Sequence, residues 1–408
     1  MLVLVGAGGI AFAVLVAWLM APRVSISPVP VDPTDWFDPE ELRRADAFRD
    51  GQRLLYLGQI LAQLIFLSLL VFGPTGLELG RRLSAAERRP VVVGLLTSAA
   101  ILTVLQLVAL GFGLAGHFRA VDVGLSVQST GGWLIDYLIS SLIFVSVGSL
   151  IASGVLWLGR KFGSRWWLPG SIGVIALAAL FVWAAPPVLA PIFNHYEPLE
   201  AGPVREETLR LARAAGVDVG EVYRVDASRR TTGINAFVDG LGSTKRVVLY
   251  DTLLAKLPPA QIRSVVAHEL AHAQREDVVR GLVWFALVVP AAVLFVALVG
   301  RRLAPGGSGA LGMPASIPSL LLATAVVVAV LQVVGNGLSR AVELNADERA
   351  LELTDSPRAL IGLQQRLVGK NLGDPDPPGW SQVLLGTHPS ADRRIGLALA
   401  WENEHRRP

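Results

Sequence analysis

Seven stretches of the chain are apolar over about the length that a membrane-spanning helix needs. A helix crosses the hydrocarbon core of a bilayer with about 20 consecutive, mostly apolar residues. One such stretch could equally be a buried helix of a soluble domain, but seven could not. The pattern therefore predicts seven transmembrane helices. The predicted segments are residues 1–21, 54–77, 90–116, 137–159, 166–193, 278–300 and 315–338.

The pattern becomes polar after the fifth apolar stretch. Residues 195–277 contain an amphipathic helical pattern at 206–215 and three short segments with the alternation and composition of strands. We therefore expect an all-α polytopic membrane protein that carries a small α+β domain. The predicted strands are residues 221–227, 235–238 and 246–250.

Two parts follow from this division. Residues 1–193 form an N-terminal membrane region with five predicted spans, and residues 194–408 hold the polar segment and the last two spans. Between the first two spans, residues 22–51 form a polar connection that ends in a charged amphipathic stretch at 40–53. The first apolar stretch has no positively charged start and no cleavage site, so we expect a retained helix and not a signal peptide.

Composition supports a membrane protein and limits the chemistry. The chain is 52% hydrophobic and 17% charged, whereas soluble domains average about 25% charged residues. A net charge of +3 without a long basic run excludes nucleic acid as an expected partner. The chain has no cysteine, so any metal must be held by His, Asp or Glu.

The candidate chemistry centres on His268-Glu269-Leu270-Ala271-His272, which fits the pattern HExxH. Residues four apart project from one face of a helix, so both imidazoles can bind one metal ion. Glu269 can then act as a base without being a ligand. The alternative is a solvated helix with two surface histidines. The apolar residues around the motif, Val265 and Leu270 among them, disfavour that alternative.

A third ligand is needed, and Glu343 is the best candidate. It follows the last predicted span on a segment that can return to the HExxH helix. Asp347 lies four residues later on the same face. It can accept the second ring N–H of a metal-bound histidine and so fix its tautomer. The alternative is an ordinary acidic surface of a helix.

Two other functions remain possible at this point. A metal transporter would carry its ligands inside the spans, but the spans hold only neutral polar groups such as Gln63, Gln106 and Asn336. A metal-stabilised scaffold without activity would need no base, so Glu269 argues against it. Hydrolysis of a generic peptide would separate an enzyme from both.

Together the two motifs resemble those of the gluzincin metallopeptidases. Because two predicted spans separate HExxH from Glu343-x-x-x-Asp347, the chain is similar to the membrane peptidases of family M48. Four spans precede the fifth, which leads into the polar domain, so the resemblance is closer to the CAAX prenyl protease 1 (Ste24) type than to the shorter HtpX type. Further stretches that carry the resemblance are residues 124–136, 186–194, 232–237, 245–254 and 388–395.

The resemblance implies a zincin-like peptidase domain and one Zn²⁺ ion per chain, in a chamber walled by membrane helices. Its ligands would be His268, His272 and Glu343, and Glu269 would be the general base. Asp347 matches a family residue described as a supporting carboxylate or proton donor. The remaining implied positions are His388 and Arg394, which polarise the substrate carbonyl, and Asn235, Ala236 and Phe237 on the substrate-binding edge strand.

The resemblance also implies the partners. We expect a zinc endopeptidase that cleaves membrane-associated or prenylated (CaaX-type) substrates, among them peptides, membrane proteins and lipidated proteins. The lipid bilayer is the second expected partner. The composition is typical of a bacterial source, so we expect a multi-pass protein of the bacterial plasma membrane whose catalytic domain faces the cytoplasm.

Overall fold

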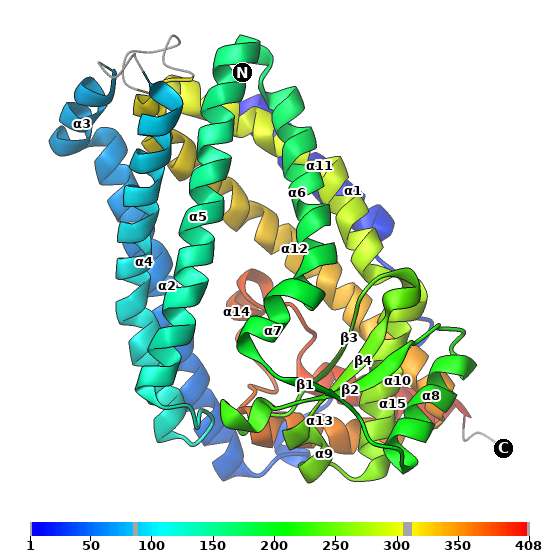
Figure 1. Ribbon diagram of the computed structural model, residues 1–408. Helices are drawn as coiled ribbons and strands as arrows, with labels where there is room; N and C mark the ends of the chain where they lie inside the picture. The colour runs from blue at the N-terminus through cyan, green and yellow to red at the C-terminus, as the bar shows by residue number, and fades with distance from the viewer. Residues whose placement is uncertain (1, 85–88, 305–311, 406–408) are drawn as a thin grey trace.

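A computed structural model describes residues 2–84, 89–304 and 312–405 of the chain. Long helices stand side by side above a small sheet and a group of shorter helices (Figure 1). Within the described residues, six helices are long and apolar enough to cross a membrane, and α1 is a shorter apolar helix that brings the number to the expected seven. The helices of the membrane part are α1 (Leu2–Met20), α2 (Pro39–Phe72), α3 (Pro74–Ser84), α4 (Pro90–Asp122), α5 (Thr130–Phe162), α6 (Trp167–Ala184), α7 (Ala190–Phe193), α11 (Asp277–Leu303) and α12 (Ile317–Thr354).

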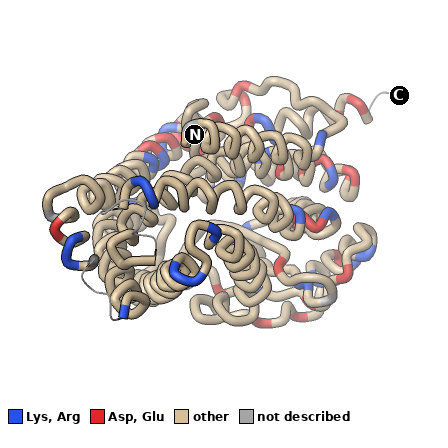
Figure 2. Tube along the Cα trace, turned by 90° about the horizontal axis from the view of Figure 1, so that it is seen from above, with Lys and Arg blue, Asp and Glu red and all other residues tan. Residues whose placement is uncertain are grey.

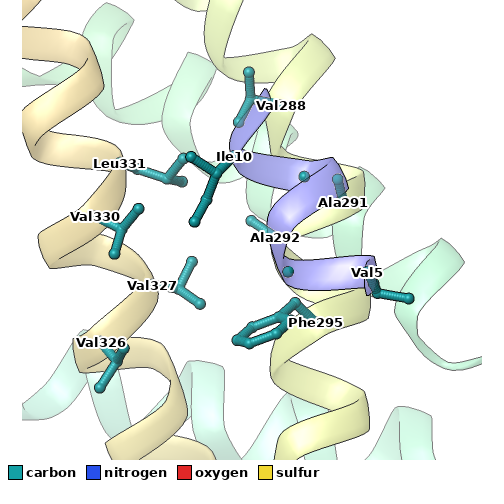
Figure 3. A pocket seen from close by; sticks show the side chains of 12 residues that line it. Val5, Ile10, Val288, Ala291, Ala292, Phe295, Val326, Val327, Val330 and Leu331 are labelled. Atoms are coloured by element: carbon teal, nitrogen blue, oxygen red, sulfur yellow. The ribbon is translucent and has the colours of Figure 1, made fainter. Parts of the chain in front are cut away.

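Helix α1 packs against α11 and α12, far from it in the sequence. Gly6 allows the close approach, because a Cβ atom there would lie 2.7 Å from the ring of Phe295. The three helices enclose a small apolar pocket of about 170 Å³, into which Ile10 and Val327 project (Figure 3). Helix α1 is therefore held by helix contacts and not only by lipid.

The second predicted span differs from the structure at both ends. Helix α2 is continuous from Pro39 to Phe72, so the charged stretch and the apolar stretch form one rod. The predicted span at 54–77 ends too late, because Gly73 terminates α2 and Pro74 begins α3. Proline cannot donate the backbone hydrogen bond that would continue a helix, and this Gly-Pro pair was the available signal.

The sheet has the strand order β1-β2-β4-β3. Strands β2 (Glu221–Val225) and β4 (Arg246–Tyr250) are parallel, and β3 (Ala236–Asp239) runs antiparallel to β4 at one edge. The alternation of strand residues turns Val247 and Leu249 toward the core, while Val248 faces the opposite side. Strand β1 (Tyr196–Pro198), which pairs with β2 at the other edge, was not predicted because three residues show no usable periodicity.

Several short helices complete the peptidase part. The sheet packs its Val247 face on α10 (Pro259–Arg275). The C-terminal end of α12 and the helices α8 (Pro203–Ala214) and α13 (Pro357–Asn371) pack against α10. The other short helices of this part are α9 (Asp251–Lys256), α14 (Gly379–Leu384) and α15 (Ala391–His405).

The segment after α1 belongs to the same core, although it lies in the N-terminal part of the sequence. Ile26 and Phe37 are buried with residues of α10, α13 and α15. Glu348 on α12 accepts hydrogen bonds from the N–H groups of Ser25 and Ile26, at 2.7 and 3.1 Å, and Val29 N donates to the carbonyl of Gly396 at 3.2 Å. Residues 22–37 therefore form a strap that ties the first span to the peptidase core.

Charged residues mark the ends of the long helices. Seen from above, the helix shafts are mostly tan and blue segments lie at their near ends (Figure 2). Basic residues occupy the last turns of α3, α5 and α11, at the end of the bundle far from the sheet. This distribution is typical of helices whose ends meet lipid headgroups.

Candidate metal centre

Helix α10 presents the HExxH motif. Pro259 stands at its first position, where a missing N–H costs nothing. The helix ends at Arg275, because Glu276 adopts a left-handed conformation with φ of 55°. The apolar side of the helix, with Ile262 and Leu270, is buried against the sheet. The opposite side turns both histidines of the motif toward α12.

Three side chains converge on one point. His268 Nε2 lies 3.2 Å from His272 Nε2 and 3.2 Å from Glu343 Oε2, and His272 Nε2 lies 3.6 Å from Glu343 Oε1. One nitrogen or oxygen from each of these residues lies within 4.8 Å of the other two. Glu343 comes from α12, 71 positions after His272 in the sequence. The fold therefore brings two distant segments of the chain into contact.

The first histidine is held by a buried carboxylate. His268 Nδ1 lies 2.9 Å from Asp347 Oδ1, and the Asp347 side chain is 0% exposed. Arg394 on α15 donates to both oxygens of Asp347, from Nε at 2.7 Å and from Nη2 at 2.6 Å. The Arg394 guanidinium therefore keeps Asp347 ionised, and Asp347 keeps the proton of a neutral His268 on Nδ1.

The second histidine has a carboxylate that the sequence analysis missed. His272 Nδ1 lies 3.0 Å from Asp277 Oδ2, and Arg275 Nε lies 3.3 Å from the other oxygen of Asp277. The left-handed Glu276 folds the chain back so that the first residue of α11 reaches the ring. An acidic residue directly after the helix was the only signal, and it does not show the direction of the turn.

These contacts fit a tetrahedral zinc ion. Zinc–nitrogen bonds of about 2.0–2.1 Å place neighbouring ligand atoms about 3.3 Å apart, which is close to the distances between the two Nε2 atoms and Glu343. With both Nδ1 atoms bonded to carboxylates, neutral rings aim their lone pairs at each other. Glu343 Oε2 is also buried without a hydrogen bond. Facing lone pairs repel each other, so a cation between them would stabilise the arrangement.

The protonation of the cluster without metal is also consistent with a metal site. Burial disfavours a charged imidazole, but Asp347 and Glu343 outweigh it and raise the pKa of His268 to about 10. A metal ion bound here would take the place of that proton, because it would bind the neutral ring. Burial also raises the pKa of Glu269, against the opposing effect of the two histidines. A carboxylate with a raised pKa is better suited to accept and return a proton.

His388 reaches the cluster from a loop. Its Nε2 lies 3.5 Å from Glu343 Oε1, and its side chain is 60% exposed. The hydroxyl of Thr387 lies 2.9 Å from Nδ1 on the other side of the ring. Pro389 follows His388 and restricts it to an extended or turn conformation. His388 is thus close enough to meet a substrate that lies over the metal ligands.

Arg394 has a different place from the one expected of a group that polarises the substrate. It is buried, and Nη2 lies 3.5 Å from His268 Nδ1, behind the ring. Two of its nitrogens are committed to Asp347. These contacts are those of a group that positions Asp347 and, through it, His268.

The expected edge strand is present. Asn235 precedes β3, and its carbonyl accepts a hydrogen bond from Tyr250 N at 3.1 Å. Pairs of an antiparallel ladder alternate, so Phe237 also bonds toward β4, while the backbone groups of Ala236 and Val238 point to the open edge. Asn235 is exposed, Phe237 is half-buried and Ala236 is buried. This edge can pair with an extended peptide.

Two family models match the chain. Residues 198–402 match peptidase family M48, and residues 24–195 match the N-terminal region of CAAX prenyl proteases, described as five membrane helices. The second match begins inside the strap and ends close to the boundary expected at residue 193. Between them the two models cover nearly all of the chain.

Individual relatives agree with these matches. The uncharacterized metalloprotease YhfN of Bacillus subtilis is 29% identical over 91% of this chain and 88% of its own length. A Protease HtpX homolog of Acaryochloris marina is 30% identical over 66% of this chain and 96% of its own. CAAX prenyl protease 1 of Saccharomyces cerevisiae is 29% identical over 37% of this chain and 34% of its own.

One solved structure shows the same fold over nearly the whole molecule. The crystal structure of S. mikatae Ste24p superposes with a TM-score of 0.75 and covers 98% of both chains, at 20% sequence identity. At that identity the likeness concerns the fold.

Proposed function

Because the chain belongs to peptidase family M48 and is a membrane metallopeptidase, we propose that His268, His272 and Glu343 hold one zinc ion and that Glu269 is the base. The observation that carries the proposal is the spacing of the two Nε2 atoms and the Glu343 oxygens, each pair at 3.2 to 3.6 Å. Both histidine rings are fixed from behind by carboxylates. A transporter or an inactive scaffold has no comparable support.

The chain's own residues divide the reaction between them. Zinc, when bound, polarises the scissile carbonyl and lowers the pKa of the attacking water toward about 7. Glu269 accepts a proton from that water as the new C–O bond forms. It then donates this proton to the amide nitrogen as the C–N bond breaks. His388 donates from Nε2 to the carbonyl oxygen as it gains charge.

The substrate is proposed to be an extended peptide on the open edge of β3. Backbone groups of Ala236 and Val238 face that edge, Phe237 lies between them and Asn235 precedes them. In strand addition, main-chain hydrogen bonds supply the affinity, and pockets for alternate side chains supply the specificity. Several relatives are named CAAX prenyl proteases, which supports membrane-associated substrates that include prenylated ones.

A pair of variants tests the reaction. Glu269→Gln removes the base but no ligand, so zinc content should stay at one per chain while hydrolysis of a generic fluorogenic peptide falls at least about 100-fold. Glu404→Gln is a matched control, because Glu404 is exposed at the end of α15. A chelator should abolish the wild-type activity and zinc should restore it. Undiminished hydrolysis by Glu269→Gln would rule out Glu269 as the base.

We also propose that the peptidase part faces the cytoplasm of a bacterial cell. The basic ends of α3, α5 and α11 then face outward, against the positive-inside tendency, which is weak beside large domains. Because the chain has no cysteine, cysteines introduced one at a time can determine the orientation. An impermeant thiol reagent should label Ser164→Cys in intact cells, and Glu404→Cys only after permeabilisation. The reverse pattern would invert the orientation.

A further inference from the structure

A cavity of about 650 Å³ adjoins the candidate metal centre. His388 and Arg394 line it on the side of the metal ligands. The first turns of α2 that follow the strap, with Arg49 and Arg53, also line it, together with α13 and the loop before α15. Its volume lies within the range of about 300–1,000 Å³ that is typical of ligand sites. The reaction proposed above assigns no role to the end of the cavity formed by α2.

Arg49 is the unusual residue in this wall. Its Nε donates to the carbonyl of Leu372 at 2.5 Å and its Nη2 to the carbonyl of Asn371 at 2.8 Å. A guanidinium has five N–H donors, so three remain. Arg49 is half-buried and forms no ion pair with any residue that the structure describes. Its charge is therefore available to an anion in the cavity.

The other charges of the wall are already matched. Arg394 is paired with Asp347, and Arg53 is paired with Asp374 and, at 2.8 Å, with Asp50. Among the described residues that line the cavity, Arg49 is the one cation without a carboxylate partner. Arg53 contacts two carboxylates, so the lack of a direct partner, and not a net surplus of charge, sets Arg49 apart.

Gln364 gives an independent indication of a missing ligand. It lines the cavity from α13, is only 2% exposed, and its buried Nε2 has no hydrogen-bond partner. A buried amide without a partner destabilises the fold, because it has lost its hydrogen bonds to water and gained none. Such groups are rare in folded proteins unless something binds to them.

On the premise of the peptidase function proposed above, we propose that this cavity binds the C-terminal carboxylate of the peptide substrate and that Arg49 is the carboxylate-binding residue. The cavity runs from His388 to Arg49. Its wall includes Asn371, whose side chain bonds Ile234 just before β3, so a peptide that pairs antiparallel with β3 has its C-terminal end on this side. Gln52, Gln332 and Gln382 also line the cavity. Their amides suit a peptide backbone better than the acyl chains of a lipid.

The test uses one peptide in two forms and the full-length protein. A fluorogenic peptide that the wild type cleaves is made with a free C-terminal carboxylate and with a C-terminal amide. The wild type should prefer the carboxylate in kcat/KM by about 10-fold to 100-fold, as hydrogen bonds to charged groups do. Arg49→Gln should bring this ratio close to one, and Arg49→Lys should restore part of it.

A purely structural role for Arg49 gives a different result. Its two carbonyl contacts lie at the end of α13 and could simply cap that helix. Loss of a cap would slow both peptides equally and leave the ratio unchanged. Arg43→Gln is the matched control, because Arg43 is exposed on the same helix and does not line the cavity. It should keep the wild-type ratio.

Binding separates this inference from the peptidase function. Labelled forms of both peptides can be titrated into Glu269→Gln, and the carboxylate form should bind about 10-fold more tightly or better. This preference should disappear in Glu269→Gln combined with Arg49→Gln. Equal binding of the two forms would overturn the inference even if the protein is a peptidase. A dependence of both peptides on anionic phospholipid, equal for the two forms, would also overturn it and assign Arg49 to a lipid headgroup.

Discussion

The two histidines of the motif are held in two different ways. His268 is supported by Asp347 and Arg394, which come from two other helices and are buried. His272 is supported by Asp277, which lies five residues further along the chain and whose side chain is 10% exposed. One support depends on the packing of the whole peptidase core, and the other depends on a local reversal of the chain.

Because of this difference, we expect the two supports to contribute differently to folding stability and to zinc affinity. Asp347 and Arg394 form a buried ion pair, and removing one partner of such a pair leaves an uncompensated charge. The cation beside Asp277 is Arg275, whose side chain is 20% exposed, so water can solvate the charge that remains when Asp277 is changed. A change on the His268 side should therefore affect both folding and zinc, while a change on the His272 side should affect zinc alone.

The largest effect is expected for Glu343, the proposed ligand that lies beside both His268 and His272. Glu343→Ala removes the only proposed ligand outside the motif, and neither histidine support can replace it. Zinc affinity should fall by more than about 100-fold, which exceeds the 10-fold to 100-fold range of supporting residues. Metal analysis after gel filtration measures this. Full zinc occupancy in Glu343→Ala would remove Glu343 from the ligand set.

The next largest effect concerns the buried side. Asp347→Asn keeps the shape but leaves the Arg394 charge unpaired, so unfolding should become easier by about 3–5 kcal/mol. Zinc affinity should also fall by about 10-fold to 100-fold. Thermal unfolding of the zinc-free protein in detergent isolates the first effect. A melting temperature equal to that of the wild type would show that the pair contributes no stability.

His388 supports neither histidine, so it provides a reference for both supports. Its Nε2 is close to Glu343, but the ring is exposed and unnecessary for holding either histidine. His388→Ala should lower kcat by about 10²–10³ and leave zinc content unchanged, as the loss of one oxyanion donor does. Steady-state kinetics with metal analysis test this. Loss of zinc would make His388 a ligand instead.

The smallest effect is expected on the local side. Asp277→Asn should weaken zinc binding by about 10-fold, at the lower end of the range for supporting carboxylates, and leave thermal stability nearly unchanged. Competition with a fluorescent chelator gives the affinity. If Asp277→Asn destabilised the zinc-free fold as much as Asp347→Asn, the proposed difference between the two supports would be wrong.

The sequence predicted the parts of the site that depend on helical spacing. His268 and His272 share a face because they are four residues apart, and so do Glu343 and Asp347. The long apolar stretches predicted the spans for the same local reason. The membership in family M48 that the motifs suggested is confirmed.

Other parts depend on tertiary packing that no local pattern reveals. Asp277 reaches His272 only because Glu276 adopts a left-handed conformation. The place of Arg394 depends on how α15 packs against α12. The strap is polar and rich in proline in the sequence, yet Ile26 becomes part of the core. In each case the decisive contact joins residues whose approach is set by the whole fold.

The most direct test of the account is to locate the metal. Diffraction from crystals of the purified protein, measured on both sides of the zinc absorption edge, would place the ion without any assumption about ligands. The account predicts one anomalous peak per chain, about 2.0–2.2 Å from His268 Nε2, His272 Nε2 and an oxygen of Glu343. A well-ordered protein with no peak there, or with its zinc on His388 in place of Glu343, would contradict it.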